Sequence, residues 1–126
     1  MLLSLRLENF VIVDAAELEF GPGFTVLSGE TGAGKSILID ALLLAMGGRA
    51  DAGVVREGCA RADIAAEFRS DDELDAWLAE RALQGDAGSV LLRRVVEADG
   101  RSRALVNDHP ATAAALREIG ERLVDI

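Results

Sequence analysis

One short stretch of the sequence combines the residue types that hold a chain of phosphate groups. It fits the pattern G-x-x-x-x-G-K-[ST] at every fixed position. Glycine lets the backbone approach a ligand closely, so that amide N–H groups can surround several negative charges, and a helix that starts here would add the positive end of its dipole. The pattern therefore predicts a site for a nucleoside triphosphate, formed by Gly29, Glu30, Thr31, Gly32, Ala33, Gly34, Lys35 and Ser36.

Two side chains of this phosphate loop have defined roles in the prediction. We expect Lys35 to bridge the β- and γ-phosphates of ATP and the hydroxyl of Ser36 to ligate Mg²⁺. Lys35 is the only lysine beside twelve arginines, and a compact ammonium reaches between phosphate oxygens where a planar guanidinium would not fit. The alternative is a chance glycine turn before a helix, and the strand and helix patterns on either side of the loop argue against it.

The residues around the loop predict the elements that would position it. Alternation of apolar and polar residues over 3–7 and 16–20 predicts two strands. A turn at 21–23 precedes a short apolar run at 24–28, which we interpret as a buried strand leading into the loop. The helix expected over 34–46 is apolar nearly all round, and this pattern is typical of a buried helix.

The next elements are predicted from glycines, alternation and a capping pattern. The glycine pair at 47–48 should end the first helix. Residues 49–61 predict a surface loop with one short turn, and alternation resumes over 62–69 as a strand. Ser70 followed by Glu73 has the form of a capping box. A helix is therefore expected to follow with its inward face formed by Leu74, Trp77, Leu78 and Ala82.

The last third of the chain predicts a hairpin and a helix. Residues 90–98 and 101–107 should form the hairpin, closed by a two-residue turn at Asp99-Gly100. A final helix is expected over 112–123, because three apolar residues there share one face: Leu116, Ile119 and Leu123. Together these elements predict an α/β lobe with a mixed, antiparallel-rich sheet wrapped on the loop helix and two peripheral helices.

Composition limits what the chain can do by itself. Half of its 126 residues are hydrophobic, which suits one aliphatic core, and the formal net charge is −9. This charge argues against a free-standing binder of nucleic acid or of an anionic membrane, although it leaves room for a local basic patch. The single cysteine, Cys59, permits no internal disulfide and fits the cytosol. We find no signal peptide and no apolar run long enough to span a bilayer.

Two features narrow the class of phosphate-loop protein. Two alternating strands precede the strand that feeds the loop, and Gly32 gives the loop the form G-x-x-G-x-G-K-S. Both features are typical of an ABC-type ATPase head. Over essentially its whole length the sequence resembles the N-terminal head segment of the RecN family of bacterial DNA repair proteins, which are relatives of the SMC proteins. The resembling segments are residues 7–13, 29–37, 40–42, 47–50, 91–95, 99–103 and 116–120.

The resemblance implies an architecture and a set of partners. Members of this family pair an N-terminal and a C-terminal half-head, which a long antiparallel coiled coil joins. Residues 1–126 would then be the N-terminal lobe, with three partners: the C-terminal head lobe of the same protein, a second copy through two heads that sandwich two ATP molecules, and DNA held during double-strand break repair. The resemblance also implies that the protein is cytoplasmic and associated with the nucleoid. Asn9-Phe10 and the 49–61 loop would lie near the nucleotide or on the head surface.

A complete ATPase of this kind needs more motifs than the sequence offers. No apolar stretch ends in Asp-Glu, so the Walker B carboxylate pair is missing, and residues 123–126 lack the second acid. We expect the chain alone to contain no catalytic residue, to bind nucleotide weakly and to hydrolyse essentially none. Three alternatives remain: a head segment of another SMC-family or ABC-type ATPase, a stand-alone phosphate-loop kinase or GTPase, and a non-hydrolysing nucleotide- or DNA-binding adaptor.

Several polar residues have both a functional and a structural interpretation. Arg49 and Arg56 could sense DNA or act in trans, or could form ordinary surface ion pairs. Asp40 could lie buried against the loop. His109 has no second metal ligand nearby, and the acids at 71–75 suit the first turn of a helix better than a metal cluster. The hairpin arginines could contact a DNA backbone or merely balance nearby acids; they are Arg93, Arg94, Arg101 and Arg103.

Overall fold

The computed structural model describes residues 2–11, 13–19 and 32–124, with side chains for 2–11, 13–17 and 37–123. The turn predicted at 21–23 and the strand predicted at 24–28 lie outside these residues. The elements, in chain order, are β1 (Leu2–Phe10), β2 (Val13–Glu19), α1 (Gly32–Ala45), the 3₁₀ turn η1 (Ala52–Val54), β3 (Arg61–Arg69), α2 (Asp72–Glu80), β4 (Ser89–Glu97), β5 (Ser102–Val106), β6 (His109–Ala111) and α3 (Ala113–Val124).

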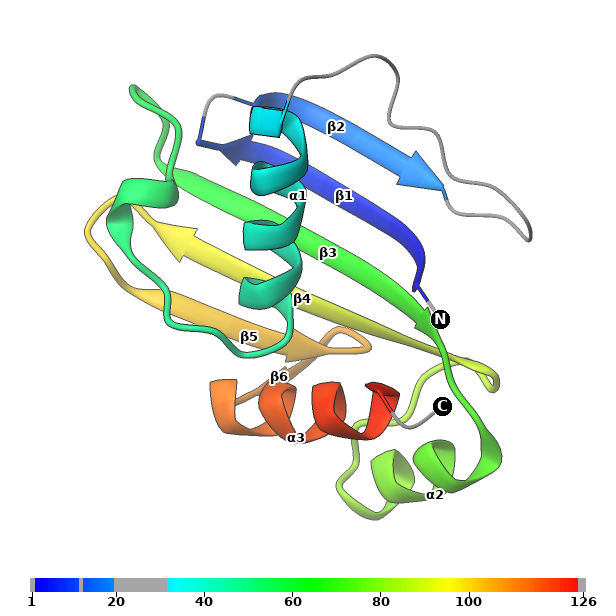
Figure 1. Cartoon of the computed structure of the whole chain (residues 1–126). Coiled ribbons are helices and arrows are strands. Elements are labelled where there is room, and N and C mark those ends of the chain that lie inside the picture. Colours follow the sequence, from blue (N-terminus) through cyan, green and yellow to red (C-terminus); the bar gives the residue numbers. More distant parts are fainter. Residues whose placement is uncertain (1, 12, 20–31, 125–126) are drawn as a thin grey trace.

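One sheet forms the body of the molecule (Figure 1). Its strands lie in the order β2-β1-β3-β4-β5-β6. The prediction was a mixed sheet rich in antiparallel pairs, and each neighbouring pair within the described residues is antiparallel. The strands predicted at 3–7, 16–20 and 62–69 are confirmed as β1, β2 and β3. The short turn predicted within 49–61 is confirmed as η1.

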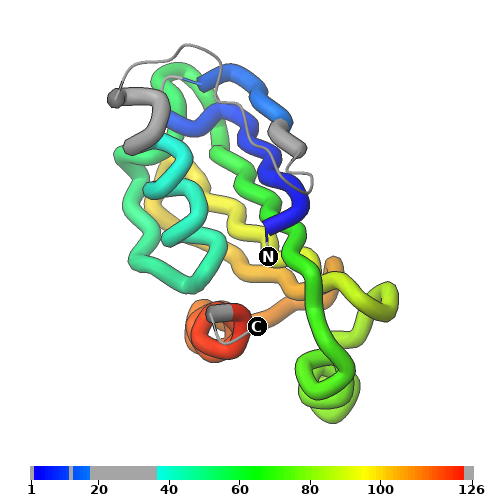
Figure 2. The backbone as a smooth tube through the Cα atoms, turned by 45° about the vertical axis from the view of Figure 1, so that its right-hand side comes forward, coloured from blue at the N-terminus to red at the C-terminus, as the bar shows by residue number. Residues whose placement is uncertain are grey.

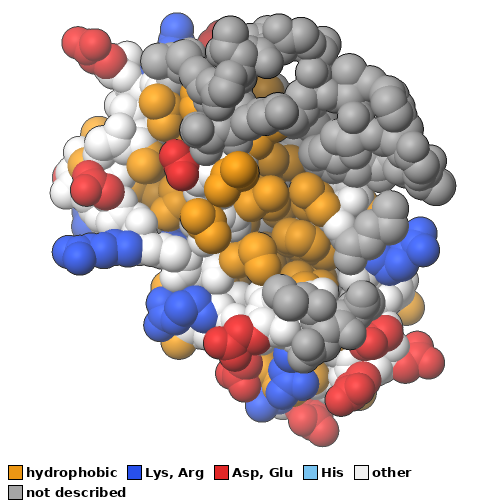
Figure 3. Space-filling model, viewed as in Figure 1, with side chains coloured by type: hydrophobic (Ala, Val, Ile, Leu, Met, Phe, Trp, Pro, Cys, Tyr) orange, Lys and Arg blue, Asp and Glu red, His pale blue; other side chains and the backbone are white. Residues whose placement is uncertain are grey.

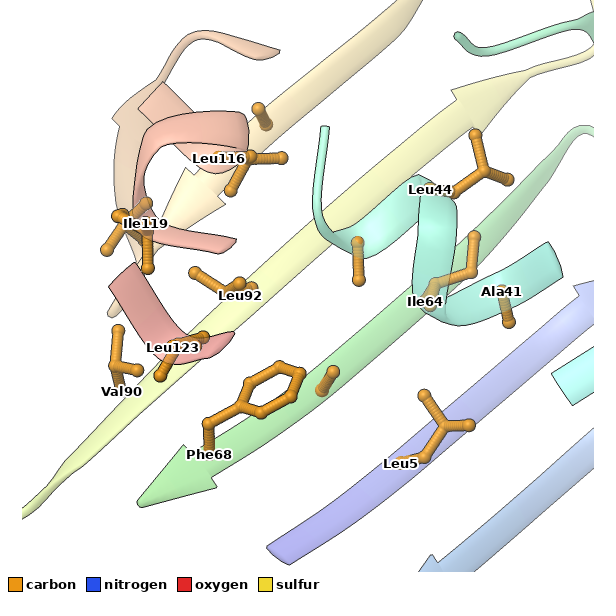
Figure 4. Close-up of a cluster of buried hydrophobic side chains, with 14 of the residues drawn as sticks. Leu5, Ala41, Leu44, Ile64, Phe68, Val90, Leu92, Leu116, Ile119 and Leu123 are labelled. Atoms are coloured by element: carbon orange, nitrogen blue, oxygen red, sulfur yellow. The ribbon is translucent and has the colours of Figure 1, made fainter. Parts of the chain in front are cut away.

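Most buried apolar residues of the strands share one face of the sheet. Figures 1 and 2 show that α1 and α3 lie over one face. The shared face follows from the alternation of the strands, since every second side chain points to the same side. The predicted inward face of the last helix is confirmed, because Leu116 and Ile119 are fully buried. Figure 4 shows the resulting core, in which side chains from the sheet meet those of both helices. Its labelled members include Leu5, Ile64, Phe68, Leu92, Leu116, Ile119 and Leu123.

The cap of α2 lies one residue later than the sequence suggested. The side chain of Asp71 accepts a hydrogen bond from the amide of Leu74 at 2.8 Å. Ser70 is not the cap, because its hydroxyl donates to a carboxylate oxygen of Asp75 at 2.6 Å instead of accepting from the first turn. Its amide donates to the carbonyl of Gly88 at 3.0 Å. The buried face of α2 is otherwise as predicted. The exception is Ala82, which is exposed because it lies after the end of the helix.

The two-residue turn is in a different hairpin from the predicted one. Between β4 and β5 the amide of Glu97 donates to the carbonyl of Arg101 at 2.7 Å, so residues 98–100 form a three-residue loop with Gly100 at φ +94°. The two-residue turn joins β5 to β6 instead, at Asn107 and Asp108, which both have positive φ. The prediction missed β6 because its sequence contains proline, which strands tolerate mainly at a sheet edge.

The cap assignment is testable by paired substitutions in α2. Asp71→Ala should lower the free energy of unfolding by about 1 kcal/mol, because it removes the acceptor for one free amide of the first turn. Asp72→Ala is the matched control: it removes an acidic side chain from the same turn but no capping hydrogen bond. Urea unfolding followed by circular dichroism measures both. Equal losses for the two variants would contradict the assignment.

Candidate nucleotide-binding site

The backbone of α1 starts at Gly32, inside the phosphate-loop motif and two residues before the predicted start at 34. The first amide N–H groups of a helix have no partner within it. Those of the first turn of α1 therefore remain available to a ligand in front of the helix, where the dipole also favours negative charge. Gly29, Glu30 and Thr31 lie outside the described residues, as do the side chains of 32–36. The contacts expected of these residues with phosphate and Mg²⁺ stay predictions.

The C-terminal half of α1 packs against the sheet. Ala41, Leu44 and Ala45 are at most 5% exposed and pack over β3 and β4. Figure 4 shows Ala41 and Leu44 in the same cluster of buried side chains as Ile64 of β3. Two of these contact residues are alanines, and small side chains let the helix axis lie close to the strands. The position of α1 is therefore set by contact with the two central strands.

The C-terminal end of α1 is closed by a pair of crossed backbone hydrogen bonds. The amide of Gly48 donates to the carbonyl of Leu43 at 2.8 Å, and the amide of Gly47 donates to that of Leu44 at 3.1 Å. Gly47 has φ +96°, a conformation that favours glycine. This is the Schellman arrangement, so the predicted glycine stop at 47–48 is confirmed.

Arg94 is held at this same end of α1 and is almost completely buried, with 4% of its surface exposed. Its Nη1 donates to the carbonyls of Leu44 at 3.0 Å and Gly48 at 2.7 Å. Burial lowers the pKa of Arg94, and the positive charge of Arg117 lowers it further. Neither interpretation made from the sequence, a DNA contact or a solvated cation, is correct for this arginine. The missed signal was that Arg94 occupies an inward position of β4, in phase with Leu92.

The other hairpin arginines form ion pairs with acids, as the structural interpretation proposed. On the opposite face of β4, Arg93 donates to both carboxylate oxygens of Asp63, and this hydrogen bonding raises the pKa of Arg93. Arg101 pairs with Asp99 at 2.8 Å, where the hydrogen bond lowers the pKa of the carboxyl group. Arg103 lies 3.9 Å from a carboxylate oxygen of Glu97. The carboxylates of these pairs neutralise the positive charge that would otherwise attract the phosphate backbone of DNA.

The end of β1 and the loop over residues 49–61 lie side by side. Their expected position near the nucleotide or on the head surface stays a prediction. The amide of Arg56 donates to the carbonyl of Asn9 at 2.8 Å, and the amide of Val11 donates to the carbonyl of Val54 at 2.7 Å. Asn9 and Val11 both have positive φ, which is costly for a β-branched residue such as valine. The side chain of Arg56 forms an exposed ion pair with Asp14 at 3.4 Å. Arg56 thus matches the surface-pair interpretation.

An apolar cleft of about 540 Å³ lies between this joined region and α1. Its lining includes Phe10, Leu43, Met46 and Val54, with Asp40 among the polar members. The side chain of Asp40 is exposed, so the interpretation that it lies buried is wrong. The cleft borders the face of α1 that points away from the sheet.

That outer face of α1 carries large apolar side chains in contact with solvent. Ile39 is 56% exposed and Leu43 is 58% exposed. Figure 3 shows hydrophobic side chains gathered where Figure 1 places α1. The prediction that α1 is a buried helix is wrong for this side of it, because the described residues leave Ile39 and Leu43 exposed. We define Ile39 and Leu43 as the outer apolar face of α1.

The remaining candidates do not assemble a second site. Among residues 2–11, 13–19 and 32–124, no group of three or more His, Cys, Asp or Glu side chains could hold a metal ion. His109 lies with Nε2 3.1 Å from the carbonyl oxygen of Gln84. Asp75 accepts from the hydroxyl of Ser70 and the amide of Gly88, so this acid supports the start of α2. In the described part of the chain, none of the helices has the length and apolar character to cross a membrane.

Comparison with protein families matches residues 4–107 to the AAA domain. The chain belongs to the AAA domain family. Over its whole length the chain is 48% identical to the DNA repair protein RecN of Xylella fastidiosa, 45% to that of Haemophilus influenzae and 41% to that of Bacillus subtilis. The chain spans 22–23% of the length of these relatives. The resemblance to the RecN family is confirmed.

The AAA domain also has the fold of SMC heads. An SMC head bound to the C-winged helix domain of ScpA matches 94% of this chain and 39% of its own, with a TM-score of 0.74 and 26% identity. A chain from a study of SMC ATPases matches 98% of this chain and 79% of its own, with a TM-score of 0.75 and 24% identity. RecF bound to ATP matches 92% of this chain and 30% of its own, with a TM-score of 0.68 and 18% identity. The predicted fold class is confirmed.

Neighbouring leucines of the AAA domain test which face of α1 is covered. Leu44→Ala should lower the free energy of unfolding by about 2–5 kcal/mol, because the side chain is buried against the sheet. Leu43→Ala should change it by no more than about 0.5 kcal/mol, because the side chain is already exposed to water. Chemical unfolding of the chain comprising residues 1–126 measures both. A large loss for Leu43→Ala would show that this face is covered after all.

Proposed function

We propose that residues 1–126 form the ATP-binding N-terminal lobe of a split, SMC-like head in a DNA repair ATPase. The observation that carries the proposal is the start of α1 at Gly32, within the phosphate-loop motif. Whole-length identity to RecN proteins and the SMC head fold support it. The alternative of a stand-alone kinase or GTPase has no such support.

The donors that the motif offers suit ATP with Mg²⁺. Free amides at the start of α1 and the ammonium of Lys35 are donors without acceptor capacity, as a triphosphate requires. A hydroxyl at Ser36 is an oxygen ligand of the kind that Mg²⁺ accepts. Bound Mg²⁺ would neutralise charge on the phosphates. The lobe itself binds and orients the nucleotide, while the carboxylate that positions water comes from the rest of the protein. The isolated lobe is therefore inactive in hydrolysis.

The outer apolar face of α1 is where the C-terminal lobe of the same protein docks. Two large, half-exposed apolar side chains beside an apolar cleft form a surface that a partner would cover. The relatives are more than four times as long as this chain, so residues that could supply such a partner exist in them. The study of the SMC neighbour describes ATP-driven dimerization of SMC ATPases. By analogy, ATP controls dimerisation of two complete heads here, in a cytoplasmic, nucleoid-associated protein that acts on DNA double-strand breaks.

Direct DNA binding by the isolated lobe is the second candidate and is disfavoured. The net charge is −9, and the hairpin arginines are either paired with acids or buried. A filter-binding assay at two salt concentrations separates the candidates. The proposed lobe shows weak DNA affinity at both concentrations, whereas a DNA-binding adaptor shows strong affinity that falls steeply with salt.

A single substitution in the loop tests the nucleotide site. Lys35→Ala should abolish measurable MgATP binding and leave the fold intact, because it removes the one ammonium placed at the phosphates without changing the core. Calorimetric titration gives the affinity, and circular dichroism gives the fold. Arg69→Ala is a matched control, since it removes an exposed cation from the last residue of β3, at the end of the strand that lies away from the start of α1 (Figure 1). If Lys35→Ala bound MgATP as tightly as the unmodified protein, the role given to Lys35 would be wrong.

A further inference from the structure

Arg94 is an unusual residue to find in this core. Among the described residues it is the only charged side chain classed as buried, and none of the ion pairs in the described part of the chain includes it. Removing a cation from water without an opposing charge is costly. The guanidinium instead meets two main-chain carbonyls at the end of α1, those of Leu44 and Gly48, and the hydroxyl of Ser102 at 3.4 Å.

A second arginine approaches the same helix end from another element. Arg117 of α3 donates from Nη1 to the carbonyl of Gly47 at 3.0 Å. The approach is close, because a Cβ atom at Gly47 would lie 2.4 Å from Cγ of Arg117, and one at Gly120 would lie 3.1 Å from the end of Met46. The C-terminal end of α1 is thus joined to α3 as well as to the sheet.

The two guanidinium groups therefore share one task. They supply donors to three carbonyls at the negative end of the helix dipole, whereas α1 has no basic residue in its own last turn. The cations reach this end only from β4 and α3. The Schellman bonds pair the carbonyls of Leu43 and Leu44. The carbonyls of Gly48 and Gly47 receive their donors from Arg94 and Arg117.

We propose that Arg94 and Arg117 form a clamp that positions the phosphate-binding start of α1 by fixing its opposite end. The inference rests on the proposed function of the loop. An α-helix of this length is a rod of about 20 Å. Holding one end against β4 and α3 sets the direction of the rod, and hence where the free amides of its first turn are presented. Arg94 and Arg117 are positioning residues that act on the nucleotide only through α1.

The outer half of α1 makes such a clamp necessary. Ile39, Asp40 and Leu43 are exposed, so the helix is packed against the sheet on one side only. A helix held on one side can tilt away from the strands unless its end is fixed. The clamp opposes this tilt in the lobe before any partner covers the outer apolar face.

The test compares substitutions at neighbouring arginines in the protein at its natural length. Arg94→Lys keeps the charge on a side chain that is shorter by one bond, Arg94→Met keeps the approximate volume without donors, and Arg117→Met removes the second arm. Arg93→Met is the matched control, because Arg93 lies on the opposite face of the same strand and does not contact α1. The readouts are the Kd for MgATP by calorimetry and, in nucleotide-free protein, hydrogen exchange of the α1 amides.

The clamp predicts a graded loss of affinity that stability alone does not produce. The Kd for MgATP should rise severalfold in Arg94→Lys and Arg117→Met and roughly tenfold or more in Arg94→Met, while exchange of α1 amides accelerates in all three. Arg93→Met should change neither the Kd nor the exchange of the α1 amides, even if it lowers the melting temperature as much as the substitutions of Arg94 and Arg117 do. If Arg94→Met does not fold, Arg94→Lys and Arg117→Met test the clamp in its place. Both should fold, because the first keeps the charge and the second changes an exposed side chain.

Two results would overturn different claims. Unchanged affinity and unchanged α1 exchange in Arg94→Lys and Arg117→Met would overturn the clamp. An unmodified protein that binds no MgATP would overturn the proposed function instead, and the exchange measurement would still judge the clamp by itself.

Discussion

The free amide groups at the start of α1 are the constraint on which the rest of the structure depends. A helix that begins inside a glycine-rich motif leaves its first donors unpaired, and only a ligand with several acceptors can use them together. Their value to a ligand depends on their being held in one place. The sheet, the Schellman end and the two arginines all act on the other half of the same helix, so the fold is organised around holding α1.

The way α1 is held also explains why one side of it remains apolar and uncovered. Small residues bring it against β3 and β4, while Ile39 and Leu43 point to solvent. A helix that is apolar on every side fits between two layers, and the described residues supply only one. The uncovered side and the adjoining cleft are continuous with the helix that carries the phosphate loop. A second lobe that docked there would therefore contact the same helix whose first turn presents its amides to the nucleotide.

Most elements could be predicted because their patterns are local. Alternation in β1 and β3, the glycine pair after α1 and the apolar face of α3 depend on neighbours in the sequence, and each is confirmed. The failures have tertiary causes. Ser70 fits a capping pattern, yet its hydroxyl donates to Asp75, and the side chain that accepts from the first turn is that of Asp71.

The candidate site divides in the same way. The helix that follows the motif was predicted, although it begins two residues before the predicted start. The contacts of Arg94 were not predicted, because they lie at a helix end more than forty residues earlier in the chain. Its inward phase in β4 was visible in the sequence, but nothing local shows which acceptors a buried cation will meet. The prediction that α1 is a buried helix failed for a related reason. An apolar pattern shows that a helix needs to be covered, but it does not show which part of the protein covers it.

The most direct test of the account is a titration of the isotope-labelled chain with MgATP, followed by the amide resonances in NMR spectra. The account predicts that the largest changes fall on the amides of residues 29–36, with smaller changes along α1 and little in β5 or β6. Changes concentrated elsewhere, for example around the cleft lined by Phe10 and Val54, with residues 29–36 unaffected, would contradict it.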